Sequence, residues 1–310
     1  MPDDLAELLH ELKHELILAT RILANQNVLD AFGHVSVRHL RDPKRYFIPR
    51  HRAPELAEIA DIVELDLDSE PVRPTQFRLY SERVIHGEIY KARPDINAVC
   101  HHHSHAVLPF CISGRELVPV FHLGAVMGYV PFWDQREEFD DTNMLVVSPE
   151  EGASLARALG ANAMVLMRRH GATVVGTNVR ELTFCTVFSC DNAALQSPAM
   201  VHGHVDRLSP GEIERAAAHS ARPPSTNRAW DYWVRHVEKG RLDAGAHRVK
   251  AEDREKEQDA ETALAASLRE LLTDSEICVI HGAARQSNKR TLSVLPRRRL
   301  KTTRTAVADH

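Results

Sequence analysis

The sequence lacks the features that mark secreted, membrane and nucleic-acid-binding proteins. Its five cysteines are an odd number with no CxxC pair, which indicates a reduced, intracellular protein rather than a disulfide scaffold. There is no apolar run of about 18 residues, and the acidic, amphipathic N-terminus does not have a signal-peptide pattern. The net charge of -4 offers no concentrated positive field for phosphates. We therefore expect a cytoplasmic protein with no nucleic-acid or membrane partner.

What the sequence does contain is enough apolar residue content for a substantial core. The chain has 310 residues, of which 43% are hydrophobic, so it is long enough for one large domain or two modest ones. It shows no internal repeat. Its 19 histidines are many for this length, but only their spacing can indicate a function.

Hydrophobic periodicity predicts mixed α and β structure. Helical spacing of apolar residues indicates helices over residues 4–26, 81–92, 150–159 and 179–202. Alternating or short apolar runs indicate strands over residues 32–38, 46–49, 62–66, 98–103, 118–121, 142–147, 165–170 and 173–176. Hairpin-like joins outnumber strand-helix-strand alternation. The sheet should therefore be mainly antiparallel or mixed, with helices flanking it.

The composition changes near Gly240, which predicts two parts of the chain. Residues 1–238 form the expected catalytic domain, and residues 239–310 are a charged tail that is partly helical or disordered. The basic run Arg297 to Lys301 is most simply a solvated segment. Its alternative interpretation is a nuclear-localisation signal or a patch for an anionic partner.

Four residues form a candidate metal centre. His101 and His103 lie two positions apart in a predicted strand, so both side chains point to the same side, where they can chelate an ion. His170 follows an apolar run and precedes Gly171, at the end of another predicted strand. Glu82 opens the helix before His101, and is either a fourth ligand or a general acid/base beside a metal-bound substrate. His102 should point to the opposite strand face.

These motifs together resemble the class II aldolase/adducin family. The matching blocks span roughly residues 5 to 235 and stand in the family's order: Gly33-His34-Val35-Ser36-Val37-Arg38, Ser81-Glu82-Arg83 through Ala98-Val99, His101-x-His103-Ser104, and Arg169-His170-Gly171 with Val174-Val175-Gly176. The resemblance implies a three-layer α/β/α fold with a central, largely antiparallel or mixed sheet. It also implies a cyclic homo-oligomer, often a tetramer, with active sites near subunit interfaces.

The same resemblance assigns roles to individual residues. It implies that His101, His103 and His170 bind one divalent metal ion and that Glu82 is the catalytic acid/base or a carboxylate close to the metal. Imidazole ligands suit zinc, manganese, iron and cobalt alike, so the sequence does not choose among them. A bound cation would stabilise the negative charge that appears when a carbon–carbon bond breaks.

Departures from the family's phosphate-binding pattern bear on the substrate. Sugar-phosphate aldolases of the family hold phosphate with short donors, but here His34, Arg50-His51 and Tyr80 stand at those positions. Bulky residues do not form the cradle of short hydroxyls and backbone amides that a phosphate needs. Arg50 and Arg52 would instead grip a planar carboxylate. The Gly-His-x-Ser-Val-Arg form is similar to members that decarboxylate hydroxylated aromatic or pyridine dicarboxylates.

Several further positions have two interpretations. The resemblance brings His34, Ser36 and Ser81 to the substrate-binding side, although His34 is equally suited to supporting a turn. His122 is either an acid or hydrogen-bond donor towards the substrate or a structural residue. The pair Tyr232-Trp233 most often indicates packing, and its alternative is to close a neighbouring subunit's site.

Three functions compete. The first is a metal-dependent carbon–carbon lyase that decarboxylates a hydroxylated aromatic or heteroaromatic carboxylate. The second is an aldolase or epimerase acting on a hydroxy-keto substrate without phosphate. The third is a non-catalytic, adducin-like interaction domain, which is expected to lack a full ligand set, whereas this chain keeps all four residues.

Overall fold

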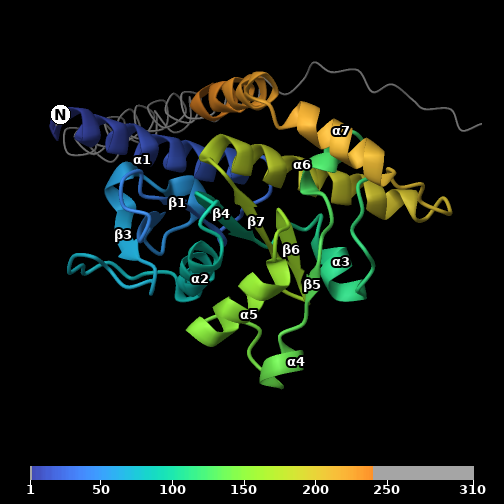
Figure 1. The fold of residues 1–310 in the computed structure, drawn as a ribbon, viewed down its shortest axis with the longest axis horizontal. Coiled ribbons are helices and arrows are strands. Elements are labelled where there is room, and N and C mark those ends of the chain that lie inside the picture. The colour runs from blue at the N-terminus through green and yellow to red at the C-terminus, as the bar shows by residue number, and fades with distance from the viewer. Residues whose placement is uncertain (1, 240–310) are drawn as a thin grey trace, which may run out of the picture. The chain divides into compact units, whose positions relative to one another are not determined.

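A seven-stranded sheet lies between two layers of helices (Figure 1). The computed structural model describes residues 2–239, and the predicted tail lies outside the described residues beyond its first position. The strands are β1 (His34–Arg38), β2 (Arg45–Pro49), β3 (Ile62–Asp66), β4 (Ala98–His102), β5 (Phe132–Trp133), β6 (Met164–Met167) and β7 (Gly171–Gly176).

The strand order is β3-β2-β1-β4-β7-β6-β5, and β4 therefore lies at the centre of the sheet. Every neighbouring pair is antiparallel except β5 and β6, which are parallel. The predicted mixed, largely antiparallel sheet is confirmed. Because β4 is paired on both sides, its register is fixed by β1 and by β7.

The helices are divided between the two faces of the sheet. In Figure 1, α1 (Pro2–Asn25), α6 (Val179–Ala199) and α7 (Pro210–Ser220) run above the sheet, whereas α2 (Val84–Ala92), α4 (Arg136–Phe139) and α5 (Pro149–Leu159) lie below it. The short α3 (Leu108–Ser113) follows β4, and another helix runs from residue 223 to the end of the described range. The predicted α/β/α layering is thus observed.

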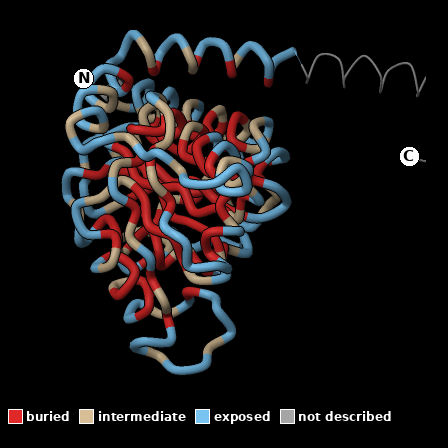
Figure 2. The backbone as a smooth tube through the Cα atoms, turned by 90° about the vertical axis from the view of Figure 1, so that its right-hand side faces the viewer, coloured by how far each residue is buried: buried red, intermediate tan, exposed pale blue. Residues whose placement is uncertain are grey.

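Two hydrophobic cores result, one on each face, because strand side chains alternate. Met164 and Leu166 of β6 pack into the core against α1 and α6, while Val165 and Met167 pack into the core against α2 and α5. Figure 2 shows the buried residues gathered in the interior of the described part. Continuous burial of β4, β6 and β7 follows from having helices on both faces.

Two predicted strands are wrong, for a common reason. Residues 118–121 form no strand because side-chain amides of α6 bind their backbone, with Gln196 Oε1 accepting from the Val118 N–H and Asn192 Oδ1 from the Val120 N–H. Residues 142–147 are likewise irregular, and the Val146 and Val147 N–H groups donate to the carboxylates of Glu82 and Glu151. In both segments side chains replace a neighbouring strand as hydrogen-bond partners.

The two-residue strand β5 escaped prediction because it is too short to show a pattern. None of the described helices is long and apolar enough to cross a membrane.

Candidate metal centre

The structure brings the four predicted residues together. Glu82, His101, His103 and His170 each offer one ligand atom, and these atoms all lie within 4.8 Å of one another. Within residues 2–239 this is the one group of three or more histidine, cysteine or acidic side chains with such geometry. Glu82 and His101 are buried, whereas His103 and His170 are partly exposed, so the cluster is open on one side.

The alternation of β4 explains why His101 faces the cluster. Val99 packs into the core beneath α2 and Cys100 into the opposite core, so His101 turns to the α2 side and His102 away from it. His103 follows directly after the strand. The predicted opposite orientation of His102 agrees with this register.

The other two residues, His170 and Glu82, each lie in a turn outside β4. His170 ends the turn between β6 and β7, and its N–H donates to the carbonyl of Met167. Glu82 lies in the 3-10 turn Ser81–Arg83, which leads into α2. A kink at Glu82, whose φ is -91° and ψ is 19°, separates this turn from the helix.

Glycines let the neighbouring chain segments approach β4. A Cβ on Gly171 would lie 2.2 Å from the carbonyl oxygen of His102, so only glycine fits where β7 begins. Gly33 has a φ of +87°, and a Cβ there would lie 2.9 Å from the carbonyl oxygen of His101. On both sides of the histidine segment, the neighbouring backbone can therefore come this close only because the residue there is glycine.

The three imidazoles converge through their Nε2 atoms. His103 Nε2 lies 3.0 Å from His101 Nε2 and 3.1 Å from His170 Nε2. Metal–nitrogen bonds of about 2.0–2.1 Å put two ligand atoms of one ion roughly this far apart. His101 Nδ1 lies 3.2 Å from Thr173 Oγ1, whose own proton points to the sulfur of Met167. His101 therefore donates from Nδ1, which leaves Nε2 free to bind an ion.

The carboxylate of Glu82 is held in place by the backbone. Its Oε1 accepts a 2.9 Å hydrogen bond from the N–H of Val146. The same oxygen lies 3.4 Å from His170 Nε2, and Oε2 lies 3.7 Å from His101 Nε2. Glu82 thus borders the position on which the three nitrogens converge.

Burial favours the neutral form of the His101 and His103 imidazoles. Removal from water lowers the pKa of His101 well below its usual value, and the neighbouring histidines lower it further. The pKa of His103 is lowered for the same two reasons, although Glu82 opposes the shift. Neutral imidazole is the form that binds a metal, so three nitrogens beside one carboxylate fit a divalent cation. This donor set does not distinguish zinc, manganese, iron and cobalt.

Sequence reasoning missed His86, which lies behind the cluster. Its ring is fully buried and bonds both His34 and Ser36, two of the predicted substrate residues. Ser36 also bonds Tyr90 and has no exposed surface, so its hydroxyl is used inside the protein. The available signal was the four-residue spacing of His86 and Tyr90, which puts both on one face of α2.

The rings of His34 and Tyr80 form one side of the cluster, which we call its wall. The centroid of the His34 ring lies 5.3 Å from that of His101 and 4.6 Å from that of Tyr80. Arg50 and Arg52, in contrast, both bind the buried carboxylate of Asp61, at 2.6 and 2.8 Å. Within the described residues Asp61 is thus their carboxylate partner, and a role of either arginine towards the substrate stays a prediction.

Two further predicted residues stand apart from this wall. Ser81 is exposed, next to Glu82. His122 is also exposed and lines a cavity of about 690 Å³ together with Phe184, Phe188 and Trp233. None of the residues lining this cavity belongs to the four-residue cluster. Within the described chain, His122 is not brought to the candidate metal centre, and its catalytic role remains a prediction.

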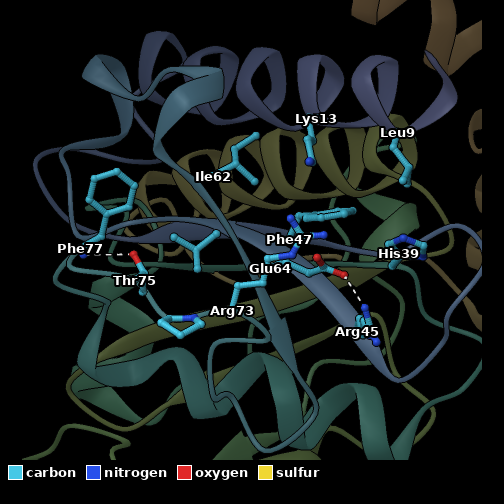
Figure 3. A pocket seen from close by; sticks show the side chains of 12 residues that line it. Leu9, Lys13, His39, Arg45, Phe47, Ile62, Glu64, Arg73, Thr75 and Phe77 are labelled. Atoms are coloured by element: carbon cyan, nitrogen blue, oxygen red, sulfur yellow. Dashed lines mark hydrogen bonds and ion pairs between the residues drawn. The ribbon is translucent and has the colours of Figure 1, made fainter. Parts of the chain in front are cut away.

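Another cavity, of about 450 Å³, lies between α1, the outer strands β2 and β3, and the segment after β3 (Figure 3). Lys13 approaches the ring of Phe47 to 4.6 Å there, and Arg45 pairs with Glu64. None of its lining residues is a predicted metal ligand. This cavity is therefore distinct from the candidate metal centre.

The fold and the cluster together define a class of protein. A family model, described as the class II aldolase and adducin N-terminal domain, matches residues 14–196. This chain belongs to the class II aldolase and adducin family.

Two named proteins and one solved structure are similar to this chain. The chain is 34% identical over 251 residues to decarboxylase tropJ of Talaromyces stipitatus, covering 73% of this chain and 94% of that protein. It is 29% identical over 185 residues to a 3,4-dihydroxyphthalate decarboxylase of Arthrobacter keyseri, covering 54% and 71%. Among solved structures, an L-fuculose 1-phosphate aldolase from Glaciozyma antarctica has the same fold, with a TM-score of 0.63, 20% identity, and coverage of 75% and 90%.

Proposed function

We propose that this protein is a divalent-metal-dependent carbon–carbon lyase that decarboxylates a hydroxylated aromatic or heteroaromatic carboxylate. The observation that carries the proposal is the complete set of Glu82, His101, His103 and His170 in a chain whose likeness to a named decarboxylase extends over 94% of that protein. A non-catalytic, adducin-like role would not require this convergence of four ligand atoms.

The three histidines hold the cation in this proposal. A divalent cation, when bound, acts as a Lewis acid towards a chelated substrate oxygen and stabilises negative charge that develops on it. Thr173 keeps His101 in the tautomer whose Nε2 is free. The buried wall around His101 excludes water on the α2 side, which strengthens these electrostatic interactions.

Glu82 is the proposed proton carrier. Loss of carbon dioxide breaks the bond between the ring and the carboxylate carbon, and its electron pair stays with the ring carbon. That carbon must then receive a proton. The Glu82 carboxylate borders the cluster and is oriented by the Val146 N–H, so it can take the proton of the substrate's hydroxyl group and pass that proton to the ring carbon without a change of backbone position.

The substrate wall favours a carboxylate substrate over a phosphorylated one. Imidazole and phenol rings, from His34 and Tyr80, stand where a phosphate would need short hydroxyls and free amides. An aldolase or epimerase acting on a substrate without phosphate is the second candidate, because it would use the same cation and the same wall.

The test combines metal analysis with product analysis. Protein purified from metal-replete cells should contain close to one divalent ion per chain, and His103→Ala should lose most of it. His105→Ala removes an exposed histidine two positions further on and serves as the matched control. The wild-type protein and the control should release carbon dioxide from a member of a panel of ortho-hydroxy aromatic carboxylates.

Each outcome has a defined meaning. Metal without carbon dioxide from any panel member would move the assignment to aldol or epimerase chemistry. Absence of metal in the wild-type protein would remove the lyase proposal and favour an interaction domain.

A further inference from the structure

Four side chains, joined by hydrogen bonds into one row, run from the wall of the candidate metal centre into the protein. His34 Nδ1 lies 2.6 Å from His86 Nε2, His86 Nδ1 lies 2.6 Å from Ser36 Oγ, and Ser36 Oγ lies 2.8 Å from the Tyr90 hydroxyl. The exposed fraction of the residue is 4% for His34 and 1% for Tyr90, and it is zero for His86 and Ser36. One end of the row therefore meets the site and the other ends in the core.

All four side chains are neutral. Burial lowers the pKa of His86 to about 3, and the 2.6 Å contact between His34 Nδ1 and His86 Nε2 requires that one of these two nitrogens carries no hydrogen. Burial also raises the pKa of the Tyr90 phenol. Each side chain therefore carries one polar hydrogen, and four hydrogens are shared among three hydrogen bonds.

The position of the fourth hydrogen decides in which direction the three hydrogen bonds are donated. If His34 donated from Nδ1, each hydrogen would point inward, and the Tyr90 O–H would be left without an acceptor among the described residues. An unpaired buried donor is destabilising because it has lost its hydrogen bonds to water without a replacement. In the opposite direction Tyr90 donates to Ser36, Ser36 to His86, and His86 from Nε2 to His34. The hydrogens of Tyr90, Ser36 and His86 then all have acceptors, and only the hydrogen of His34, at the end beside the site, is left over.

The remaining hydrogen then lies on His34 Nε2. This atom forms no hydrogen bond within the described part of the chain, and His34 is paired with His101 in the register of β1 and β4. The His34 ring adjoins the rings of His101 and Tyr80. A donor at this edge is available to whatever binds beside the cluster.

We propose that His34 donates its Nε2–H to an oxygen of the substrate, and that His86, Ser36 and Tyr90 are positioning residues that hold His34 in this tautomer. The acceptor is a carboxylate or keto oxygen next to the oxygen held by the cation. The identity of this substrate class rests on the proposed function, whereas the tautomer does not.

The tautomer is measured first. Histidine labelled with ¹⁵N, in the full-length protein loaded with zinc, gives distinct signals for protonated and unprotonated ring nitrogens. His34→Gln and His86→Gln assign the signals by their loss. We expect both histidines to be protonated at Nε2 and not at Nδ1. Protonation of His34 at Nδ1, or at both nitrogens, overturns the proposal.

The positioning role is measured by a double-mutant cycle. Binding of salicylate to the zinc-loaded protein should weaken about tenfold in Ser36→Ala, because His34 then loses its fixed tautomer. In a His34→Gln background the same change should have almost no effect, because a side-chain amide presents N–H and carbonyl groups without tautomers. A merely structural role for Ser36 predicts equal losses in both backgrounds, and that result overturns the proposal.

Ser189→Ala is the matched control, since Ser189 is equally buried and its hydroxyl donates to the carbonyl of Cys185 within α6. It should bind salicylate as the wild-type protein does. If salicylate binds to none of the proteins while zinc is retained, the proposed substrate class fails, and the ¹⁵N spectra still decide the tautomer of His34.

Discussion

The buried imidazole of His86 should make the stability of the protein depend on pH. Its folded-state pKa is about 3, against 6.5 for a histidine in water, because burial penalises the charged ring. As pH falls below 6.5, the unfolded chain binds a proton that the folded protein does not. The contribution of His86 to stability is therefore complete above pH 6.5 and is lost progressively down to about pH 3.

The size of this loss follows from the pH interval. Each pH unit between the two pKa values costs about 1.4 kcal/mol, so lowering the pH from 7.5 to 5 should remove about 2 kcal/mol of unfolding free energy through His86 alone. That is a large share of the roughly 5–15 kcal/mol that stabilises a typical domain. The variant His86→Gln lacks this titration.

The assay is urea unfolding of metal-free protein at pH 7.5 and pH 5, with chelator present at both. The drop in unfolding free energy between the two pH values should be about 2 kcal/mol smaller in His86→Gln than in the wild-type protein. His219→Gln, at an exposed position, is the control and should keep the wild-type dependence. An equal drop in His86→Gln and the wild-type protein would refute the account of a neutral buried ring.

Two further predictions concern the metal centre. Thr173→Val removes the acceptor of the His101 Nδ1–H while keeping the volume, so zinc affinity measured by competition with a chelator should fall about tenfold to a hundredfold; unchanged affinity would mean that Thr173 does not orient His101. Gly171→Ala would bring a Cβ to 2.2 Å from the carbonyl oxygen of His102, so β4 and β7 must separate, and the protein should lose roughly 2–4 kcal/mol of stability by urea unfolding. Wild-type stability in Gly171→Ala would contradict the close approach.

The four residues of the candidate centre could be predicted because two kinds of information coincided. Strand alternation alone predicted that His101 and His103 face one side, and in the structure both belong to the cluster although β4 ends at His102. Periodicity does not bring His170 or Glu82 to the same point, since that depends on which strands are neighbours. The family resemblance provided that knowledge of topology.

The predictions of strands over two segments were wrong because side chains there replace the usual backbone hydrogen-bond partners. The apolar runs at 118–121 and 142–147 had the composition of strands, but amides of α6 and the carboxylates of Glu82 and Glu151 bind their N–H groups. No local pattern reveals such partners. His86 was missed in the same way, because its partners His34 and Ser36 lie about 50 positions earlier in the chain.

The arginines illustrate a limit of reasoning from residue type. Arg50 and Arg52 have the geometry to bind a carboxylate, and they do bind one, but it is that of Asp61 in the same chain. The pKa of Asp61 is lowered, because the hydrogen bonds and charges of these partners outweigh the burial that opposes ionisation. A role for either arginine towards the substrate would use the N–H groups that Asp61 leaves free.

The central position of β4 has a consequence for how the chain tolerates insertions and deletions. His101 and His102 end this strand and face opposite sides, and His103 follows directly after it on the side of His101. A shift of one residue against β1 and β7 would turn His102 to the cluster and both His101 and His103 away from it. A single-residue deletion between α2 and β4 should therefore abolish metal binding, whereas the irregular segment before α5 can change length at its exposed residues 143–145 with far less effect.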